Sequence, residues 1–201
     1  MVRARTDTPR DAGTFHAVRF YENKASLCRI VAEFLGEGLA TGQPALVIGT
    51  GEHRSGIVEE LGARNLDVER LEVTGDLLLL DARELMSTFM VRGVPDAELF
   101  RVSASQAIER LRRGRKNRTI RAYGEMVDLL WKDDRSVAAV QLEMLWNKLA
   151  ASRDFSLLCG YAMGNFYKDA SIDLICQQHT HVIGAEGAAG QARQSTTQLF
   201  R

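Results

Sequence analysis

A segment bounded by glycines, Gly51 to Gly56, matches the first part of the phosphate-loop pattern GxxxxGK[ST]. It follows an apolar run and opens a helical pattern, as that motif requires. Ile57 and Val58 stand where the motif places the lysine that reaches the phosphates and the hydroxyl that holds magnesium. The sequence therefore predicts a degraded phosphate loop and argues against hydrolysis of ATP.

Backbone N–H groups at this position could still bind an anion, because the N-terminus of a helix carries a partial positive charge. Alternatively, the glycines serve only the turn. Asp81, directly after the run Leu77 to Leu80, could hold magnesium, but its position favours a role as helix N-cap. The candidate anion-binding residues follow the second apolar run: Gly49, Thr50, Gly51, Arg54, Ser55 and Gly56.

Histidine and cysteine side chains offer the donors of a metal or redox site. A sensor of that kind would use His16, His53, His179 and Cys159. No spacing has the HExxH or CxxC form that indicates zinc. The sequence therefore predicts no metal site, and a metal or redox sensor stays an alternative.

Glu125 is a carboxylate at the mouth of a predicted buried strand, where it needs a partner because burial disfavours its charge. Glu143 and Asn147 lie one helical turn apart and so share a face. These side chains could form the floor of a polar pocket, or equally a satisfied structural network.

The patterns of acyl-transfer enzymes are missing, since there is no GxSxG elbow and no cysteine with a nearby activating base. No catalytic residue is predicted and no cofactor is identified. The basic cluster Arg110 to Arg118 is not interleaved with aromatic residues and is interpreted as a solvated helix end and loop. Direct contact with nucleic acid is not expected.

Short apolar runs alternate with helical patterns along the chain. Strands buried on both faces read as continuous apolar runs, and each parallel connection needs a dozen or more residues. The sequence therefore predicts an α/β fold with three layers and a mostly parallel, doubly wound sheet, whose ligands bind at the carboxyl ends of the strands. The predicted strands are His16 to Tyr21, Ala45 to Ile48, Leu77 to Leu80, Thr119 to Tyr123 and Phe155 to Tyr161, and the predicted helices are 24–42, 51–61, 83–90, 97–113 and 135–152.

Length and composition favour one domain, because 201 residues with 45% hydrophobic side chains suffice for a single core. The 26 basic and 26 acidic side chains balance, so no net field attracts nucleic acid or anionic lipid. No apolar run could span a bilayer or serve as a signal-peptide core, so a cytoplasmic protein is expected. The predicted organisation is a disordered segment 1–14, a domain 15–183 and a flexible tail 184–201.

Six stretches occur together in a characteristic order: HAVRFYE (16–22), ALVIGT (45–50), RAYGEM (121–126), LEMLWN (142–147), SLLCGY (156–161) and HTHV (179–182). They resemble the MEDS domain, the methanogen/methylotroph DcmR-type sensory domain. The resemblance covers about residues 14–184 and is more specific than any single motif above.

This resemblance implies a fold related to the RecA and KaiC ATPases with a degraded nucleotide loop. It also implies a sensory role in bacterial and archaeal regulators, where small hydrocarbon-derived molecules have been proposed as ligands and a histidine kinase or transcription regulator is the partner. The candidate ligand-binding residues, carried onto matching positions, are His16, Tyr21, Glu22, His53, Tyr123, Glu125, Glu143, Asn147, Cys159, Tyr161 and His179.

The leading hypothesis is a non-catalytic sensor that binds a small ligand at the strand ends and thereby changes its contact with a partner. One alternative is a nucleotide-binding protein without hydrolysis, and another is the metal or redox sensor. A homodimer would use an apolar face of the long helices, although burial of that face in the core explains the same pattern.

Overall fold

The computed structural model describes residues 14–113, 118–165 and 172–183. The predicted terminal segments 1–14 and 184–201 lie outside these residues, Thr14 excepted, as does part of the basic cluster 110–118.

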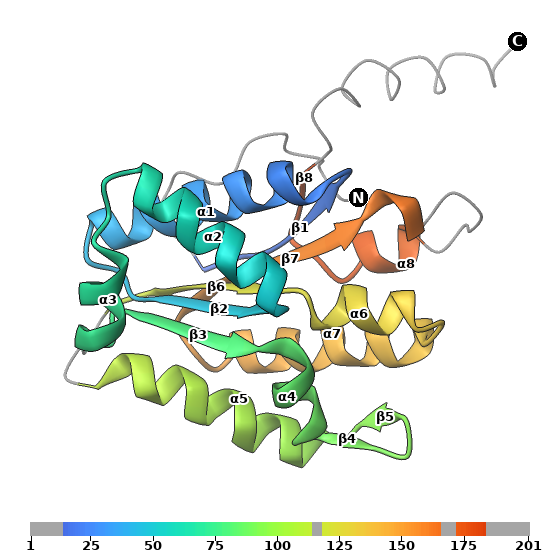
Figure 1. Cartoon of the computed structure of the whole chain (residues 1–201). Coiled ribbons are helices and arrows are strands. Elements are labelled where there is room, and N and C mark those ends of the chain that lie inside the picture. The colour runs from blue at the N-terminus through green and yellow to red at the C-terminus, as the bar shows by residue number, and fades with distance from the viewer. Residues whose placement is uncertain (1–13, 114–117, 166–171, 184–201) are drawn as a thin grey trace, which may run out of the picture.

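Six parallel strands form the central sheet, in the order β3-β2-β6-β7-β1-β8 (Figure 1). Each of the five predicted strands is present, and the short strand β8 adds one edge. The sheet therefore has the parallel topology that the alternating pattern predicts. The strands are β1 (His16–Tyr21), β2 (Ala45–Gly49), β3 (Leu77–Asp81), β6 (Ile120–Gly124), β7 (Phe155–Ala162) and β8 (His181–Ile183).

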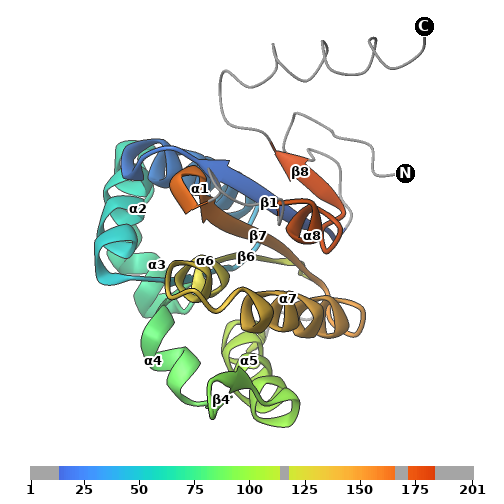
Figure 2. The same ribbon diagram turned by 90° about the vertical axis from the view of Figure 1, so that its right-hand side faces the viewer.

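Helices cover both faces of this sheet, which gives three layers (Figures 1 and 2). One face packs against α1 (Lys24–Ala40), α2 (Gly51–Ala63) and α3 (Val68–Thr74). The other face packs against α4 (Ala82–Ser87), α5 (Ala97–Arg112), α6 (Met126–Lys132), α7 (Ser136–Ala150) and the short α8 (Ile172–Cys176). A one-turn 3₁₀ helix, Met163–Asn165, follows β7.

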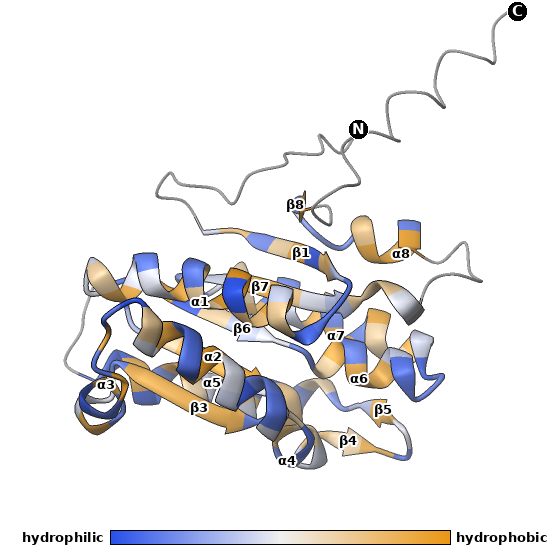
Figure 3. Cartoon of the chain, turned by 45° about the horizontal axis from the view of Figure 1, so that its top comes forward, coloured by the Kyte–Doolittle hydropathy of each residue, from blue (hydrophilic) through white to orange (hydrophobic). Residues whose placement is uncertain are grey.

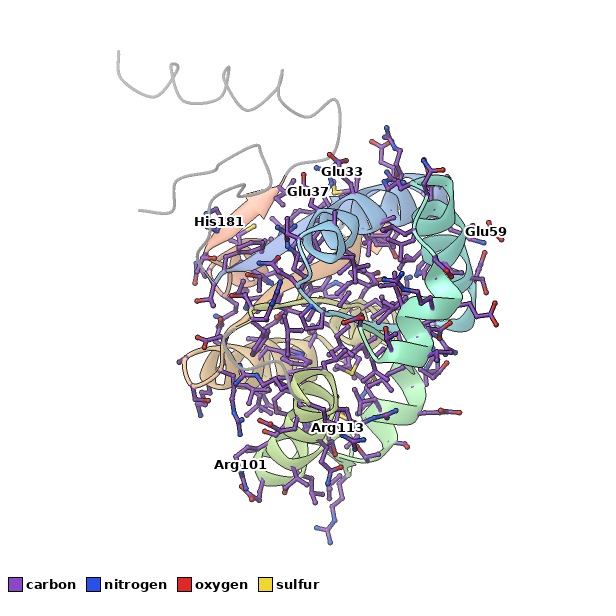
Figure 4. All side chains as sticks on the ribbon, turned by 90° about the vertical axis from the view of Figure 1, so that its left-hand side faces the viewer. Glu33, Glu37, Glu59, Arg101, Arg113 and His181 are labelled. Carbon is purple, nitrogen blue, oxygen red and sulfur yellow. The ribbon has the colours of Figure 1, made fainter. Side chains whose placement is uncertain are left out.

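Two apolar cores fill the space between these layers, one on each face of the sheet. Charged side chains such as Glu33 and Glu37 of α1 and Glu59 of α2 lie at the periphery (Figure 4). The edge strand β3 is hydrophobic along its length (Figure 3). Among the described residues, no helix is both long and apolar enough to cross a membrane.

Side-chain caps stabilise the first turns of α1 and α4. Asn23 caps α1 by accepting a hydrogen bond from the backbone N–H of Ser26. The Asp81 carboxylate caps α4 by accepting from the N–H groups of Arg83 and Glu84 at 2.9 and 3.1 Å. The capping interpretation of Asp81 is therefore confirmed.

The helices α3, α6 and α8 were not predicted from the sequence, nor was the small hairpin formed by β4 (Met90–Val91) and β5 (Val94–Pro95). The helix expected over 83–90 ends at Ser87, and the chain then turns back on itself. Arg92 and Gly93 form the two-residue connection, both with positive φ, as the primed hairpin turns require. An arginine in that position gives little turn signal, which explains the error.

The predicted phosphate loop does not form an open loop, because α2 begins at Gly51 and takes up the whole segment to Gly56. Gly56 has a packing reason instead. A Cβ atom there would lie 2.7 Å from the Sγ atom of Cys28, so the absent side chain lets α2 approach α1. Gly56 therefore serves helix packing inside α2, a role that the sequence did not suggest.

Gly56→Ala is expected to lower the free energy of unfolding by about 1–3 kcal/mol, because the new methyl group overpacks the contact with buried Cys28. Gly62→Ala in the same helix is the matched control, since a Cβ atom there meets nothing within 4 Å. That control should gain about 0.5–1 kcal/mol from helix propensity. Urea denaturation measures both changes, and equal effects would contradict the packing role of Gly56.

Candidate functional site

The structure divides the predicted ligand-binding residues into two clusters on opposite faces of the sheet. Tyr21 and Tyr123 belong to the core beneath α1 and α2, whereas Cys159 and Tyr161 belong to the core on the α7 side. We call the first group, at the carboxyl ends of β1, β2 and β6, the edge cluster: Tyr21, His53, Tyr123, Glu125 and Asp128. We call the second the inner cluster: His16, Glu143, Asn147, Cys159, Tyr161 and His179.

Glu125 is the centre of the edge cluster. Its carboxylate is 1% exposed and accepts hydrogen bonds from the backbone N–H of Thr50, from His53 Nδ1 and, at 3.1 Å, from the hydroxyl of Tyr123. Burial raises the pKa of Glu125, but the hydrogen bonds and charge of His53 and the bond from Thr50 more than offset it, so that the pKa lies below its usual value. Glu125 is therefore a buried, ionised carboxylate that accepts three hydrogen bonds.

This carboxylate lies beside the start of α2. Thr50 is the N-cap of that helix, and its N–H donates to Glu125. Among the other anion candidates, Arg54 pairs with Asp81 at 3.0 Å, and the Ser55 hydroxyl donates to the carbonyl of Gly51 within the helix. Glu125 thus places a negative charge of the chain itself beside the positive end of α2.

Asp128 is a second buried carboxylate at this edge, and the sequence analysis missed it. Its two oxygens accept from the Tyr21 hydroxyl and from the N–H of Ala162, both at 3.0 Å, and Lys132 lies 2.7 Å away. Burial and the adjacent Asp128 carboxylate raise the pKa of Tyr21 well above its ordinary value, so the hydroxyl stays a donor. An aspartate within the apolar run MVDLLW was the available signal, because such a group must be paired.

A pocket of about 120 Å³ lies beside the end of β1. Tyr21, Glu22 and Asn23 line it together with Arg19, and Glu22 is exposed there instead of joining either cluster. A larger pocket of about 290 Å³ lies at the opposite end of the sheet, between the ends of α3 and α5, and contains none of the predicted site residues.

Strand pairing assembles the inner cluster. In the register of β1 with β7, Val18 pairs with Cys159, so His16 and Cys159 are diagonal neighbours on one face. The segment before β8 lies alongside the start of β1, where the N–H of Thr180 donates to the carbonyl of His16 at 2.8 Å. This contact brings His179 to His16, with ring centroids 4.3 Å apart.

Glu143 of α7 is the centre of the inner cluster and is completely buried. The Tyr161 hydroxyl donates to its Oε1 atom at 2.8 Å. His16 Nε2 lies 3.2 Å from Oε2, and His179 Nε2 lies 3.4 Å from Oε1. Burial raises the pKa of Glu143, but the two histidines outweigh that effect and hold the pKa far below its ordinary value.

Cys159 does have a potential activating base beside it, His16, contrary to the sequence expectation, but its thiol is not activated. Its Sγ atom lies 3.2 Å from His16 Nε2 and 3.6 Å from Glu143 Oε2. Burial, followed by the negative charge of Glu143, raises its pKa well above the ordinary value of a thiol. A nucleophilic cysteine needs a lowered pKa, so this arrangement does not support covalent catalysis.

The set His16, His53, His179 and Cys159, considered for a metal or redox sensor, does not meet in one place. His53 belongs to the edge cluster on the other face, whereas the carboxylate of Glu143 joins the remaining three. The order of the strands in the sheet determines which of these residues meet. The spacing of the four residues in the sequence does not predict it.

Residues 15–180 match the family model described as MEDS, the methanogen/methylotroph, DcmR sensory domain. The chain belongs to the MEDS family. The match covers both clusters and confirms the resemblance of the six stretches. Membership of this family indicates a sensory role in signal transduction.

The fold of this MEDS domain is similar to that in the crystal structure of a KaiC-like protein from the hyperthermophilic archaeon Pyrococcus horikoshii. The TM-score is 0.53 at 13% sequence identity, and the likeness covers 81% of this chain and 69% of the archaeal chain. This likeness confirms the expected relation to the KaiC fold. No curated protein sequence matches the chain closely enough to count as a relative.

Proposed function

We propose that this MEDS domain is a non-catalytic sensor whose small ligand binds at the edge cluster. The bound state would regulate a partner such as a histidine kinase or a transcription regulator. The family description supports the sensory role. The concentration of buried ionisable groups at the carboxyl edge of a parallel sheet supports the place of binding.

A hydrogen-bond donor at this edge has no partner within the described part of the chain. The Nε–H group of Arg54 is buried and donates no hydrogen bond to the described residues, although the guanidinium pairs with Asp81 through Nη2. An unpaired buried donor is unfavourable unless a further group meets it. A ligand with an oxygen acceptor, such as a small carboxylate or carbonyl compound, would satisfy it.

The pocket beside the end of β1, which shares only Tyr21 with the edge cluster, has room for a ligand of a few heavy atoms. A volume of about 120 Å³ corresponds to about four water molecules at about 30 Å³ each. Pockets for drug-sized ligands usually measure about 300–1,000 Å³. A nucleotide is therefore a poor fit, and its phosphates would meet the negative charge of Glu125 beside the start of α2.

A ligand at the edge cluster would act through the contacts that join separate elements. Glu125 connects the end of β6 with the start of α2, and Asp128 connects α6 with the ends of β1 and β7. A ligand that binds one arrangement of these contacts more tightly than another would shift their populations. The changed position of α2 or α6 would then be the surface that a partner recognises.

We expect acetate, ethanol or ethylamine, as probes of a small acid, alcohol or amine, to raise the melting temperature of the wild-type protein. A probe at about 100 times its dissociation constant adds about 2.7 kcal/mol of stability, or roughly 5–11 °C for a domain of this size. His53→Gln should abolish the shift, whereas Glu98→Gln on the exposed side of α5 should keep it.

Native mass spectrometry of the purified protein provides the second measurement, because a retained ligand appears as excess mass over the denatured chain. Millimolar ATP should leave the melting temperature unchanged. A ligand response that His53→Gln leaves intact, or a stabilisation by ATP that the variant Gly51→Ala removes, would contradict the proposal.

A further inference from the structure

We propose that His16, Glu143, Cys159 and His179 of the inner cluster form a zinc-binding site. Their donor atoms all lie within 4.8 Å of one another, and all four side chains are buried. The site lies on the other face of the sheet from the edge cluster, so the inference goes beyond the proposed sensing function and does not depend on it.

Several of the distances between donor atoms are close to those around one tetrahedral ion. Zinc bonds of about 2.0–2.3 Å separate neighbouring ligand atoms by about 3.3–3.8 Å. The separations from His16 Nε2 to Cys159 Sγ and to Glu143 Oε2 are both 3.2 Å. Glu143 Oε2 lies 3.6 Å from Cys159 Sγ, whereas the other oxygen, Oε1, lies 3.4 Å from His179 Nε2. With one donor atom from each residue, all four atoms lie within 4.8 Å of one another, so the side chains would draw together around the ion.

Both histidines are oriented as metal ligands usually are, with the distal ring nitrogen held by an outer partner. His179 Nδ1 lies 2.7 Å from the carbonyl oxygen of Ile175, which can only accept, so this nitrogen carries the proton. His16 Nδ1 lies 2.9 Å from Asn147 Oδ1. The amide of Asn147 donates to the carbonyl of Gln178 at 2.8 Å, which fixes its oxygen toward His16.

These outer contacts leave the two Nε2 atoms as donors of electron pairs toward the centre of the cluster. His179 Nε2 is buried and forms no hydrogen bond within the described residues. Two unprotonated Nε2 atoms facing the buried carboxylate would repel it, so either a proton or a metal ion must lie between them. A bound metal ion would remove this repulsion while both imidazoles and the Glu143 carboxylate keep their positions.

The charges also balance for a divalent ion. Zinc carries two positive charges, while a Cys159 thiolate and the Glu143 carboxylate supply two negative ones and the histidines bind as neutral groups. The occupied site would therefore be neutral in a core that excludes water, and burial of unpaired charge is the main obstacle there. The Cys159 thiol loses its proton to solvent when the ion binds.

The donor set selects the class of metal. Two imidazoles, a thiolate and a carboxylate combine nitrogen, sulfur and oxygen, which zinc accepts in tetrahedral geometry, whereas magnesium and calcium require oxygen donors. With four protein ligands the site is closed, as structural zinc sites are. The ion would join β1, β7 and α7 to the segment before β8.

The test uses the full chain, stripped with a chelator and titrated with zinc alone. We expect one zinc per chain by elemental analysis and a melting temperature that falls on chelation and recovers on zinc addition. Cobalt in place of zinc should give thiolate-to-metal charge-transfer absorption. Cys159→Ser should lose that absorption, and Cys159→Ser and His179→Gln should each weaken metal binding at least about 100-fold.

Cys28→Ser and His53→Gln are the matched controls, because both lie on the other face and should bind zinc as the wild type does. Tyr161→Phe keeps all four ligands but removes the hydrogen bond to Glu143, so a loss of about 10–100-fold is expected. Failure of the folded wild type to bind zinc stoichiometrically would overturn the site. Cobalt binding without thiolate absorption in the wild type would do the same, whether or not the core variants fold.

Discussion

Replacement of Glu125 with alanine is expected to lower the free energy of unfolding by about 3–5 kcal/mol. The carboxylate is 1% exposed and accepts from Thr50, His53 and Tyr123 at once. Truncation leaves all three donors without their acceptor in a site that water hardly reaches, and each unsatisfied donor is unfavourable by about 1–3 kcal/mol. Urea denaturation of the wild type and the variant measures the difference.

Two controls separate this effect from a general loss of side-chain packing. Glu125→Gln keeps the shape and a carbonyl acceptor for Thr50, so it should lose clearly less stability than the alanine variant. Glu59→Ala on the exposed side of α2 should change stability by less than about 0.5 kcal/mol. A loss below about 1 kcal/mol for Glu125→Ala would show that the edge cluster does not stabilise the fold.

The lowered pKa of Glu125 also predicts how stability depends on pH. The ordinary pKa of glutamate, about 4.3, applies to the unfolded chain, and the folded value lies below it. The contribution of Glu125 is therefore fully present above the unfolded pKa and is lost as the pH falls through the folded pKa. Glu143 contributes with the same sign, so the test is the difference between wild type and Glu125→Gln, which should shrink below about pH 4.

The alternation of apolar runs and helical patterns was enough to predict the sheet and its two covered faces. A continuous run such as Leu77 to Leu80 is typical of a strand that contacts helices on both sides, and β3 covers that run. The hairpin after α4 was not predictable in the same way. Its turn depends on positive φ at Arg92 as well as at Gly93, and an arginine in the sequence does not indicate that conformation.

The grouping of the site residues needed the strand order. Side chains alternate along a strand, so His16 and Tyr21, which are five residues apart in β1, must face opposite sides of the sheet. Which residues meet each of them depends on β7 and β8 lying on either side of β1. That order places Cys159 and His179 beside His16, while the ends of β2 and β6 place Glu125 near Tyr21.

Asp128→Ala is expected to lower the free energy of unfolding by about 2–4 kcal/mol, because it removes the buried acceptor of two hydrogen bonds, while its charged partner Lys132 is 39% exposed. The carboxylate accepts from the Tyr21 hydroxyl and the Ala162 N–H and lies 2.7 Å from Lys132 Nζ. The N–H of Ala162 cannot reorient, so it remains unsatisfied at the end of β7. Asp128→Asn keeps an acceptor for Ala162 and should lose less.

A double-mutant cycle with Tyr21→Phe assigns part of this loss to one hydrogen bond. Tyr21→Phe removes the hydroxyl alone and is expected to lower stability by about 1 kcal/mol. If the two side chains act together, the double variant will be less destabilised than the sum of the single variants by about 0.5–3 kcal/mol. If the losses of the two single variants simply add up in the double variant, β1 and α6 are held together by packing alone. A ligand that contacts Tyr21 could then not affect α6 through this hydrogen bond.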